Sequence, residues 1–162
     1  MDSKKVIDSL IKGFGSDILV MDDSSDIHTV TVSSVVIHAV IQFLKEEEGF
    51  IFLTDLTGIH YPDQELQLGV VYHLHDFLKN KRIRIKTFVA KDDPTVATVT
   101  DIFSGANWME RETYDFYGIL FEGHPNLIRI LNVEYLDYFP MRKEYPLEDP
   151  TRKDKDDRYF GR

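Results

Sequence analysis

The fold expected of this chain is decided by residues 81–89, which read KRIRIKTFV. In this stretch Ile83, Ile85, Thr87 and Val89 occupy every second position, and the residues between them are Arg, Lys and Phe. Successive side chains of a β-strand point to opposite faces, so this period of two predicts a strand with one face on a core. The other face is expected to meet solvent or a partner.

Two more strand patterns precede this one along the chain. Residues 66–75 alternate in the same way, and residues 50–56 form a nearly continuous apolar run. Turn residues separate the three patterns, around Pro62 and around Asn80. Short turns between consecutive strands favour antiparallel pairing, so we expect a three-stranded meander.

Helical patterns and shorter strands come before the meander. Apolar residues recur at helical spacing in residues 4–14, and short strands are expected at 17–21 and 27–32. Ser33 or Ser34 is expected to cap a second helix that extends up to Gly49. The predicted fold class is therefore α+β, with a mainly antiparallel or mixed sheet, helices packed on one face, and an extended C-terminal arm.

Two further helices are expected after the meander. One is predicted between Asp93 and Gly105, because an Asp-Pro pair is typical of a helix start and apolar residues follow at helical spacing. The next is expected to span residues 107–117. There Asn107 would be the N-cap and Glu110 the second residue of a capping box.

The domain organisation follows from the loss of periodicity beyond residue 122. We expect an α+β domain over residues 1–122, which includes helix 107–117, and an extended docking arm with a charged tail over residues 123–162. The tail, residues 149–162, is highly charged but nearly neutral overall, so it is expected to be disordered when the protein is alone. Tyr159 and Phe160 are candidate anchors to a partner.

The composition excludes several classes of protein. The 162 residues can bury a real core, and the absence of cysteine excludes disulfides, thiolate zinc sites and Cys-ligated iron–sulfur clusters within this chain. A net charge of −9, from 19 Lys and Arg against 28 Asp and Glu, argues against nucleic acid as the main partner. Because no stretch reaches the roughly 18 to 20 apolar residues of a membrane span, we expect a cytoplasmic chain that reaches a membrane only through another subunit.

One candidate constellation lies on the last predicted helix. Glu110, Arg111, Glu112 and Asp115 fall at i,i+3 and i,i+4 spacings, so the one guanidinium can neutralise several carboxylates. The favoured interpretation is an ion-pair network that docks the helix. The alternative is an acid/base enzyme in which Glu112 and Asp115 exchange protons and His124 acts as a proton shuttle.

Three histidines form a second candidate. His73 and His75 share one face of a predicted strand, and His60 lies on the strand before it. A divalent metal could bridge them, but no carboxylate has an obvious place to complete the site. A polar sheet face is the favoured interpretation.

The segment from Phe121 to Leu147 combines proline-fixed extended backbone with closely spaced apolar anchors. It also carries the cations Arg129, Arg142 and Lys143. Arginine and aromatic side chains are the usual anchors of protein interfaces. We therefore expect this segment to bind a partner rather than merely to wrap its own domain.

Three separated motifs carry a resemblance to a known family. Residues 110–125 read ERETYDFYGILFEGHP, residues 129–131 read RIL, and residues 141–147 read MRKEYPL. In this order and with these gaps they closely resemble the signature of the 30 kDa subunit of respiratory complex I. In bacteria this family is the C subunit of NADH-quinone oxidoreductase.

The resemblance implies a non-catalytic structural and assembly subunit in the hydrophilic arm of the proton-translocating complex. That complex passes electrons from NADH through FMN and iron–sulfur clusters to a quinone. The resemblance implies no cofactor on this chain, a forty-nine-kilodalton-type subunit and neighbouring iron–sulfur subunits as partners, and a peripheral position on the cytoplasmic side of the bacterial inner membrane. An equivalent subunit of a ferredoxin-fed complex or of a membrane hydrogenase is the alternative.

The resemblance also implies roles for individual residues, none of them catalytic, cofactor-binding or metal-ligating. Arg111 with Glu112 and Asp115 would form an ion-paired core, and Gly118 and Gly123 would be backbone turns. The expected structural or interface residues are Glu110, Arg111, Glu112, Asp115, Gly118, Gly123, His124, Pro125, Arg129, Arg142, Lys143, Tyr145 and Pro146.

Overall fold

The computed structural model describes residues 3–22, 24 and 26–145. The expectations for the charged tail, for its anchors Tyr159 and Phe160, and for Pro146 lie outside the described residues. The elements are α1 (Ser3–Phe14), β1 (Ile18–Asp22), β2 (His28–Val32), α2 (Ile37–Glu46), β3 (Phe52–His60), β4 (Leu68–Asp76), β5 (Lys81–Val89), β6 (Thr95–Ala97), α3 (Ala106–Tyr117) and β7 (Leu120–Glu122). Short 3₁₀ turns at Gly15–Asp17 and Ser34–Val36 lead into β1 and α2. The predicted serine cap of α2 is wrong, because the 3₁₀ turn makes Val36 the N-cap and no side chain bonds to it.

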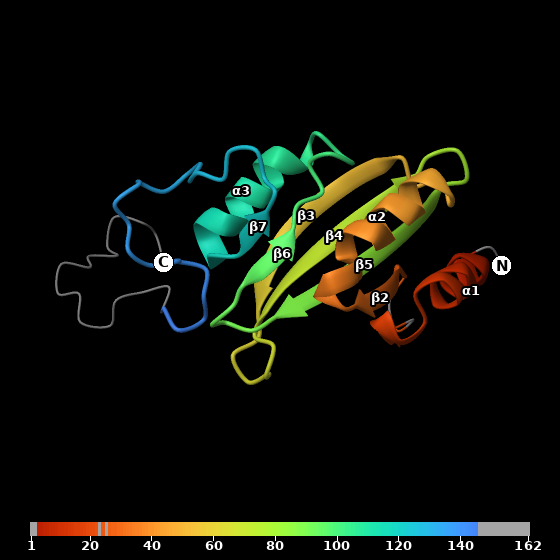
Figure 1. The fold of residues 1–162 in the computed structure, drawn as a ribbon, viewed down its shortest axis with the longest axis horizontal. Helices are drawn as coiled ribbons and strands as arrows, with labels where there is room; N and C mark the ends of the chain where they lie inside the picture. The colour runs from red at the N-terminus through yellow and green to blue at the C-terminus, as the bar shows by residue number, and fades with distance from the viewer. Residues whose placement is uncertain (1–2, 23, 25, 146–162) are drawn as a thin grey trace, which may run out of the picture.

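The main sheet has five strands in the order β1-β2-β5-β4-β3 (Figure 1). Strands β3, β4 and β5 form the expected antiparallel meander, and β1 pairs antiparallel with β2. Strand β2 runs parallel to β5, with His28 opposite Ile83 and Val32 opposite Thr87. The sheet is therefore mixed, and the predicted α+β fold class is confirmed.

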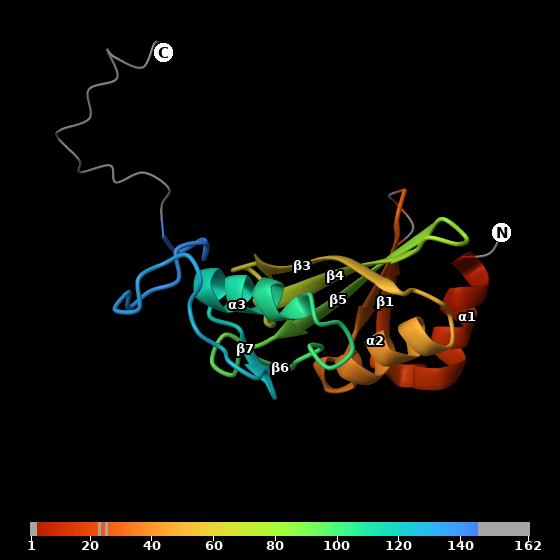
Figure 2. The ribbon, with the colours of Figure 1, turned by 90° about the horizontal axis from the view of Figure 1, so that it is seen from above.

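The core lies between this sheet and the helices. Helix α2 buries Ile37, Val40, Ile41 and Leu44, which follow the i, i+3, i+4, i+7 spacing of a one-sided helix. They belong to one apolar cluster with buried side chains of the sheet, such as Ile85. Figure 2 shows α1, α2 and the β6–β7 pair on the same side of the sheet. No helix in the described part of the chain is both long and apolar enough to cross a membrane.

Helix α3 packs against the edge strand β3. Its last residue, Tyr117, lies so close to β3 that a Cβ on Gly58 would come within 2.4 Å of the tyrosine ring. The short β6 strand runs parallel to β7, and the two are further joined by backbone bonds from Leu120 to Pro94 and from Thr98 to Glu122. The segment from α3 to β7 is thus fixed to the domain at both β3 and β6.

The helix predicted between Asp93 and Gly105 is wrong. The structure has β6 and a series of turns there instead, because Thr95, Val96 and neighbouring β-branched residues favour an extended strand that can pair with β7. The apolar residues at helical spacing in this segment are nevertheless buried, because the turns direct their side chains into the core.

The expected capping box is also wrong. Helix α3 begins at Ala106, its N-cap is Gly105, and no side chain bonds to the cap. Asn107 therefore lies inside the helix. Glu110 points instead into the interior, where it contacts the turn after β6.

Candidate functional site

The described part of the C-terminal arm, residues 123–145, is irregular, and one carboxylate is its main attachment to α3. Asp115 on α3 is fully buried, and its Oδ2 accepts the backbone N–H groups of Ile130, Leu131 and Asn132 at 3.1, 2.8 and 2.9 Å. Its Oδ1 accepts Arg129 Nη1 at 2.8 Å and the Asn132 side-chain amide at 3.1 Å. Five donors thus converge on one side chain and fix the course of four consecutive residues.

These contacts also fix the charge of Asp115. Burial alone would raise its pKa, but the backbone N–H groups of Asn132 and Leu131 and the side chains of Arg129 and Asn132 hold the pKa well below its usual range. A carboxylate that stays ionised with all its lone pairs engaged cannot exchange protons near neutral pH. Asp115 is an anchor for the arm.

Arg129 extends the anchor along the arm. Its side chain is 7% exposed, and besides Asp115 it donates to the carbonyl oxygens of Leu136 at 2.8 Å and Tyr138 at 3.4 Å. The sequence predicts Arg111 as the ion-pair partner of Asp115, and this prediction is wrong. Arg111 donates to the carbonyls of Ile128 and Arg129, both at 3.1 Å, because the oxygens of Asp115 are already filled.

A second anchor lies where α3 ends. The ring of Phe139 has the guanidinium of Arg129 at 5.2 Å and that of Arg142 at 4.7 Å from its centroid. Arg142 Nε also donates to the carbonyl of Tyr117 at 2.7 Å. Gly118 has φ of +71°, and a Cβ there would lie 2.4 Å from the Phe139 ring. Only glycine allows both this backbone and this close packing.

The two ends of the arm make further contacts with the domain. At its start, Gly123 has φ of +84°, and His124 bonds through Nε2 to the Asn107 carbonyl at 3.1 Å while Nδ1 accepts the Asn126 N–H at 3.0 Å. At its end, the backbone N–H of Lys143 donates to His60 Nδ1 at 2.9 Å.

Two further expected contacts, Tyr145 and Pro125, and one residue that was not expected to be a contact, Glu144, lie along the arm. Glu144 forms an ion pair with Lys91, and Tyr145 packs on Tyr138 with ring centroids 5.0 Å apart. Pro125 follows His124 in the turn that begins the arm and is exposed. No described contact assigns Pro125 a specific partner within the chain.

The acid/base alternative receives no support from this geometry. Asp115 is saturated, His124 is engaged at both ring nitrogens, and Glu112 is exposed beside a hollow lined by Thr57, Thr113, Phe116, Tyr117 and Met141. The three groups have three separate sets of partners. They do not form a common proton-transfer site.

The histidines are likewise divided among different partners. His73 contacts Arg84 and Asp55, His75 lies 3.4 Å from Asn80 Oδ1, and His60 binds the arm. Within residues 3–145, as far as they are described, no three His, Asp or Glu side chains cluster closely enough to hold a metal ion. The contacts of His73 and His75 fit the favoured interpretation, in which they lie on a polar face of the sheet.

Glu110 has a role that sequence reasoning missed. It is fully buried and accepts hydrogen bonds from Thr98 Oγ1 at 2.5 Å and from the Val99 N–H at 2.8 Å. Burial raises its pKa to about 7, although both hydrogen bonds act in the opposite direction. The carboxyl fastens α3 to the turn after β6, and the charged residues that follow it in sequence, Arg111 and Glu112, gave no sign of this.

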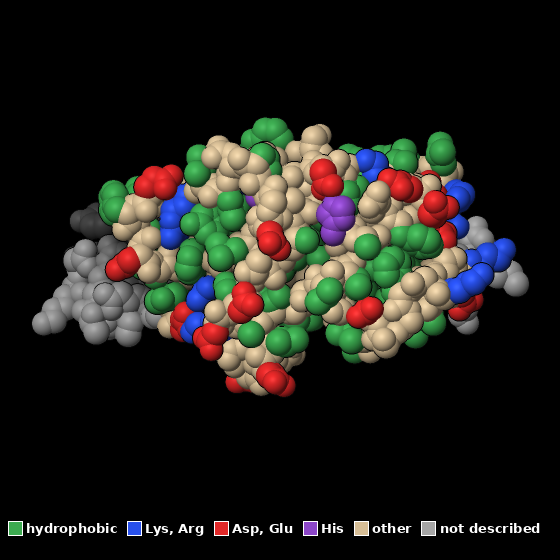
Figure 3. Space-filling model, in the orientation of Figure 1, with side chains coloured by type: hydrophobic (Ala, Val, Ile, Leu, Met, Phe, Trp, Pro, Cys, Tyr) green, Lys and Arg blue, Asp and Glu red, His purple; other side chains and the backbone are tan. Residues whose placement is uncertain are grey.

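The arm presents large apolar side chains outward while its backbone is held from beneath. Leu131 is 67% exposed and Tyr135 87% exposed, although the backbone of Leu131 is bonded to Asp115. Figure 3 shows apolar and acidic side chains side by side at this end of the molecule. The exposed apolar set comprises Trp108 on α3 together with Ile128, Leu131, Val133, Tyr135, Tyr138, Met141 and Tyr145 on the arm. Such exposure on an ordered segment is typical of a protein interface.

Comparisons with known proteins agree with these observations. Residues 30–151 match the family model described as the 30 Kd subunit of respiratory-chain NADH dehydrogenase. The chain is 36% identical over 152 residues to the NADH-quinone oxidoreductase C subunit of Geotalea uraniireducens, and the match covers 94% of this chain and 93% of that protein. It is 42% identical over 121 residues to the C 1 subunit of the same enzyme from Rhizobium meliloti, where it spans only 60% of the relative's length.

Two solved structures are similar to this one. The trypsin-resistant fragment of Nqo5 superposes with a TM-score of 0.68 at 31% identity, covering 78% of this chain and all of that fragment. A chain of the archaeal membrane-bound sulfane sulfur reductase superposes with a TM-score of 0.75 at 22% identity, covering 91% of this chain and 87% of that one. The second likeness shows a shared fold.

Proposed function

Because this chain belongs to the family of the 30 kDa subunit of respiratory-chain NADH dehydrogenase, we propose that it is a structural subunit of a proton-translocating NADH:quinone oxidoreductase, complex I. The chain supports the assembly and rigidity of the complex and carries no catalytic residue. The complex passes electrons from NADH through FMN and iron–sulfur clusters to a quinone, and those cofactors are held by partner subunits.

The observation that carries this proposal is the convergence of five donors on Asp115. Folding of the arm onto one carboxylate removes most of its freedom before any partner arrives, so less conformational entropy is lost on association. The same contacts hold Leu131 and its exposed neighbours at fixed positions. The arm is thus a preorganised docking surface.

The partners and location follow the same proposal. The arm, residues 123–162, docks on the forty-nine-kilodalton-type subunit and on neighbouring iron–sulfur subunits, while residues 1–122 form the domain that supports it. The chain reaches the cytoplasmic side of the bacterial inner membrane only through the complex. Among the expected structural and interface residues, Asp115 and Arg129 act as anchors beneath the arm, and Tyr145 acts as a contact on its outer side.

Affinity purification of the tagged full chain from detergent-solubilised membranes tests this proposal. We expect large membrane subunits, a forty-nine-kilodalton-type subunit and cluster-bearing subunits to follow the chain, together with NADH:quinone activity. Activity with reduced ferredoxin in place of NADH would assign the chain to a ferredoxin-fed complex instead. Recovery of the chain alone would contradict the proposal.

A pair of variants separates docking from folding. Trp108→Ser with Tyr135→Ser changes two exposed side chains, so the folded chain should keep its stability within about 0.5 kcal/mol each. Recovery of partner subunits should nevertheless fall severalfold, because exposed aromatic anchors carry much of an interface's binding energy. The control is Leu78→Ser, which changes a 90% exposed apolar residue in the β4–β5 turn and should leave recovery unchanged.

A further inference from the structure

The sheet has a second face that none of the described helices covers. Figure 2 shows α1, α2, β6 and β7 on one side of the five strands, and no described helix on the other. We call this second side the open face. It is separate from the anchors of the arm, which lie around α3.

A row of polar contacts crosses four strands of the open face. Asp55, His73, Arg84 and Thr29 are direct cross-strand neighbours on β3, β4, β5 and β2. Arg84 Nε donates to His73 Nε2 at 2.7 Å and Nη1 to Thr29 Oγ1 at 3.4 Å, while His73 Nδ1 lies 3.8 Å from Asp55 Oδ2. Burial and the nearby Arg84 lower the pKa of His73. The row therefore holds Arg84 rigidly in place.

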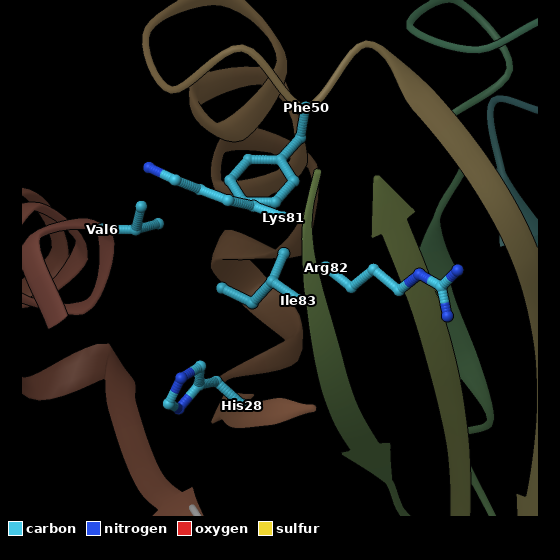
Figure 4. Close-up of a pocket in the computed structure, with 6 residues that line it drawn as sticks. All are labelled: Val6, His28, Phe50, Lys81, Arg82 and Ile83. Atoms are coloured by element: carbon cyan, nitrogen blue, oxygen red, sulfur yellow. The ribbon is translucent and has the colours of Figure 1, made fainter. Parts of the chain in front are cut away.

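Cations line up along β5 on the same face. Arg82, Arg84 and Lys86 alternate with Ile83 and Ile85, which point into the core. Figure 4 shows Arg82 pointing away from the hollow between α1 and the sheet that Ile83 lines. We call these three cations the basic stripe.

Three carboxylates lie near the stripe without forming a described ion pair with it: Asp22 lines a hollow with Lys86, and Asp26 and Asp55 line hollows with Arg82. Neither Arg82 nor Lys86 forms an ion pair with another described residue. The carboxylate of Asp22 is bonded to Ser24, which is the main cause of its lowered pKa, and Lys86 and Arg84 contribute least. Asp55 faces His73. A chain with a net charge of −9 therefore keeps three cations together on an open surface.

A hollow with an apolar side and a polar side adjoins the end of the stripe. Its apolar side is formed by Leu19 and Val20 of β1, by Tyr61 after β3, and by Phe88 on β5, and its polar side by Asp22, Thr29, Thr31, Gln64 and Lys86. Leu19 and Val20 are each 56% exposed, and the rings of Tyr61 and Phe88 lie 5.9 Å apart. The hollow can receive one large apolar side chain with the Lys86 ammonium group at its rim.

We propose that the open face docks an extended acidic segment of a partner subunit, whose carboxylates meet the basic stripe while one large apolar side chain enters the hollow. The proposal rests on the proposed function for the identity of the partner as a subunit of the same complex. Charge complementarity selects this occupant, because an acidic segment gains from the stripe and a basic one is repelled. The molecule then has two docking surfaces, the arm and the open face.

Charge reversal in the full tagged chain tests the proposal within the complex. Arg82→Glu with Lys86→Glu should reduce recovery of partner subunits at low salt at least about tenfold, and wild-type recovery should fall as salt rises. The matched control, Lys5→Glu with Lys12→Glu, makes the same charge change at exposed positions of α1 and should recover partners normally. Equal recovery by both double variants would overturn the proposal. Loss of recovery in Arg82→Lys with Lys86→Arg, which keeps both charges, would also overturn it.

A direct binding measurement keeps this result separate from the proposed function. The purified full chain is titrated with a synthetic peptide of glutamates around one phenylalanine, and backbone amide signals are followed by NMR. We expect shifts on β2, β4 and β5 that weaken when each Glu of the peptide is replaced by Gln. Absence of shifts, or shifts only on α1, would overturn the proposal. Binding by a chain that recovers no subunits would refute complex membership while supporting the acidic-segment site.

Discussion

The sheet domain and the arm are ordered by different means. The domain is held by apolar side chains such as Leu44 and Ile85, which lie fully buried between α2 and the sheet. The arm has no helix or strand among residues 123–145 and is held by Asp115, by two arginines and by the ring of Phe139. In the arm, side-chain hydrogen bonds and ion pairs replace the backbone hydrogen bonds that order a strand. The order of the arm therefore depends on a few charged side chains.

The largest effect is expected from removing the main anchor of the arm. Asp115→Ala would leave three backbone N–H groups and the buried Arg129 guanidinium without their acceptor, at a cost of about 3 to 5 kcal/mol in the free energy of unfolding. Urea titration measures this loss, and hydrogen exchange should show lost protection at residues 130–132. Glu112→Ala, on the exposed side of the same helix, is the control. Equal stability of the two variants would contradict the conclusion that Asp115 orders the arm.

The next effect tests how closely the arm packs on the end of α3. Gly118→Ala places a Cβ 2.4 Å from the Phe139 ring at a φ of +71°, so it should destabilise the chain by about 1 to 3 kcal/mol. Gly13→Ala is the matched control, because its Cβ meets nothing within 4 Å on α1 and helix propensity favours alanine. The unfolding temperature should fall for Gly118→Ala and rise slightly for Gly13→Ala. An unchanged or higher unfolding temperature for Gly118→Ala would refute the close packing of Phe139 on Gly118.

A third prediction concerns pH and separates the two buried carboxylates of α3, Glu110 and Asp115. The raised pKa of Glu110 means that the folded chain keeps its proton while the unfolded chain loses it between pH 4.5 and about 7. Stability should therefore fall across that window, by at most about 1.4 kcal/mol per pH unit, and level off above it. Asp115 contributes nothing to this slope, because its lowered pKa places its titration below the window.

Glu110→Gln checks the origin of that slope. The amide keeps a hydrogen-bonding group at the position but does not titrate, so the fall in stability between pH 4.5 and about 7 should flatten. Urea midpoints at several pH values measure it. An unchanged slope in this variant would assign the pH dependence to other groups.

The smallest effect is expected at the outer end of the arm. Lys91 and Glu144 form a partly exposed ion pair, and Lys91→Met should cost only about 0.5 kcal/mol, less at high salt. A double-mutant cycle with Glu144→Gln isolates the pair. A coupling as large as the cost of Asp115→Ala would show that the arm is held evenly along its length.

The sheet could be predicted from the sequence because its signal is local. The alternation in residues 81–89 and 66–75 recurs in β5 and β4, and the antiparallel meander follows from the short turns between consecutive strands. The parallel pairing of β2 with β5 has no such signal. It joins residues 55 positions apart, such as His28 and Ile83, and depends on how the layers pack.

The anchors of the arm were found only in part. Asp115 and Arg129 were both singled out, but their pairing was missed because i,i+4 spacing favoured the nearer Arg111. The same preference for local patterns produced the false helix before Gly105 and the false capping box at Asn107. Buried Glu110 bonds to Thr98, which lies 12 positions earlier, and only the fold brings the two together.

The parallel β2–β5 pair also sets an order for folding during synthesis. Strand β2 leaves the ribosome first and has to wait for β5, about 55 residues later. At about 5 to 20 residues per second, that delay is roughly 3 to 11 s. The hairpins of β3, β4 and β5 form within microseconds of leaving the ribosome. Strand β5 is therefore already paired with β4 when β2 pairs with it. The N-terminal hairpin is thus the last part of the sheet to find its place, and its apolar edge is the surface that a nascent chain exposes longest.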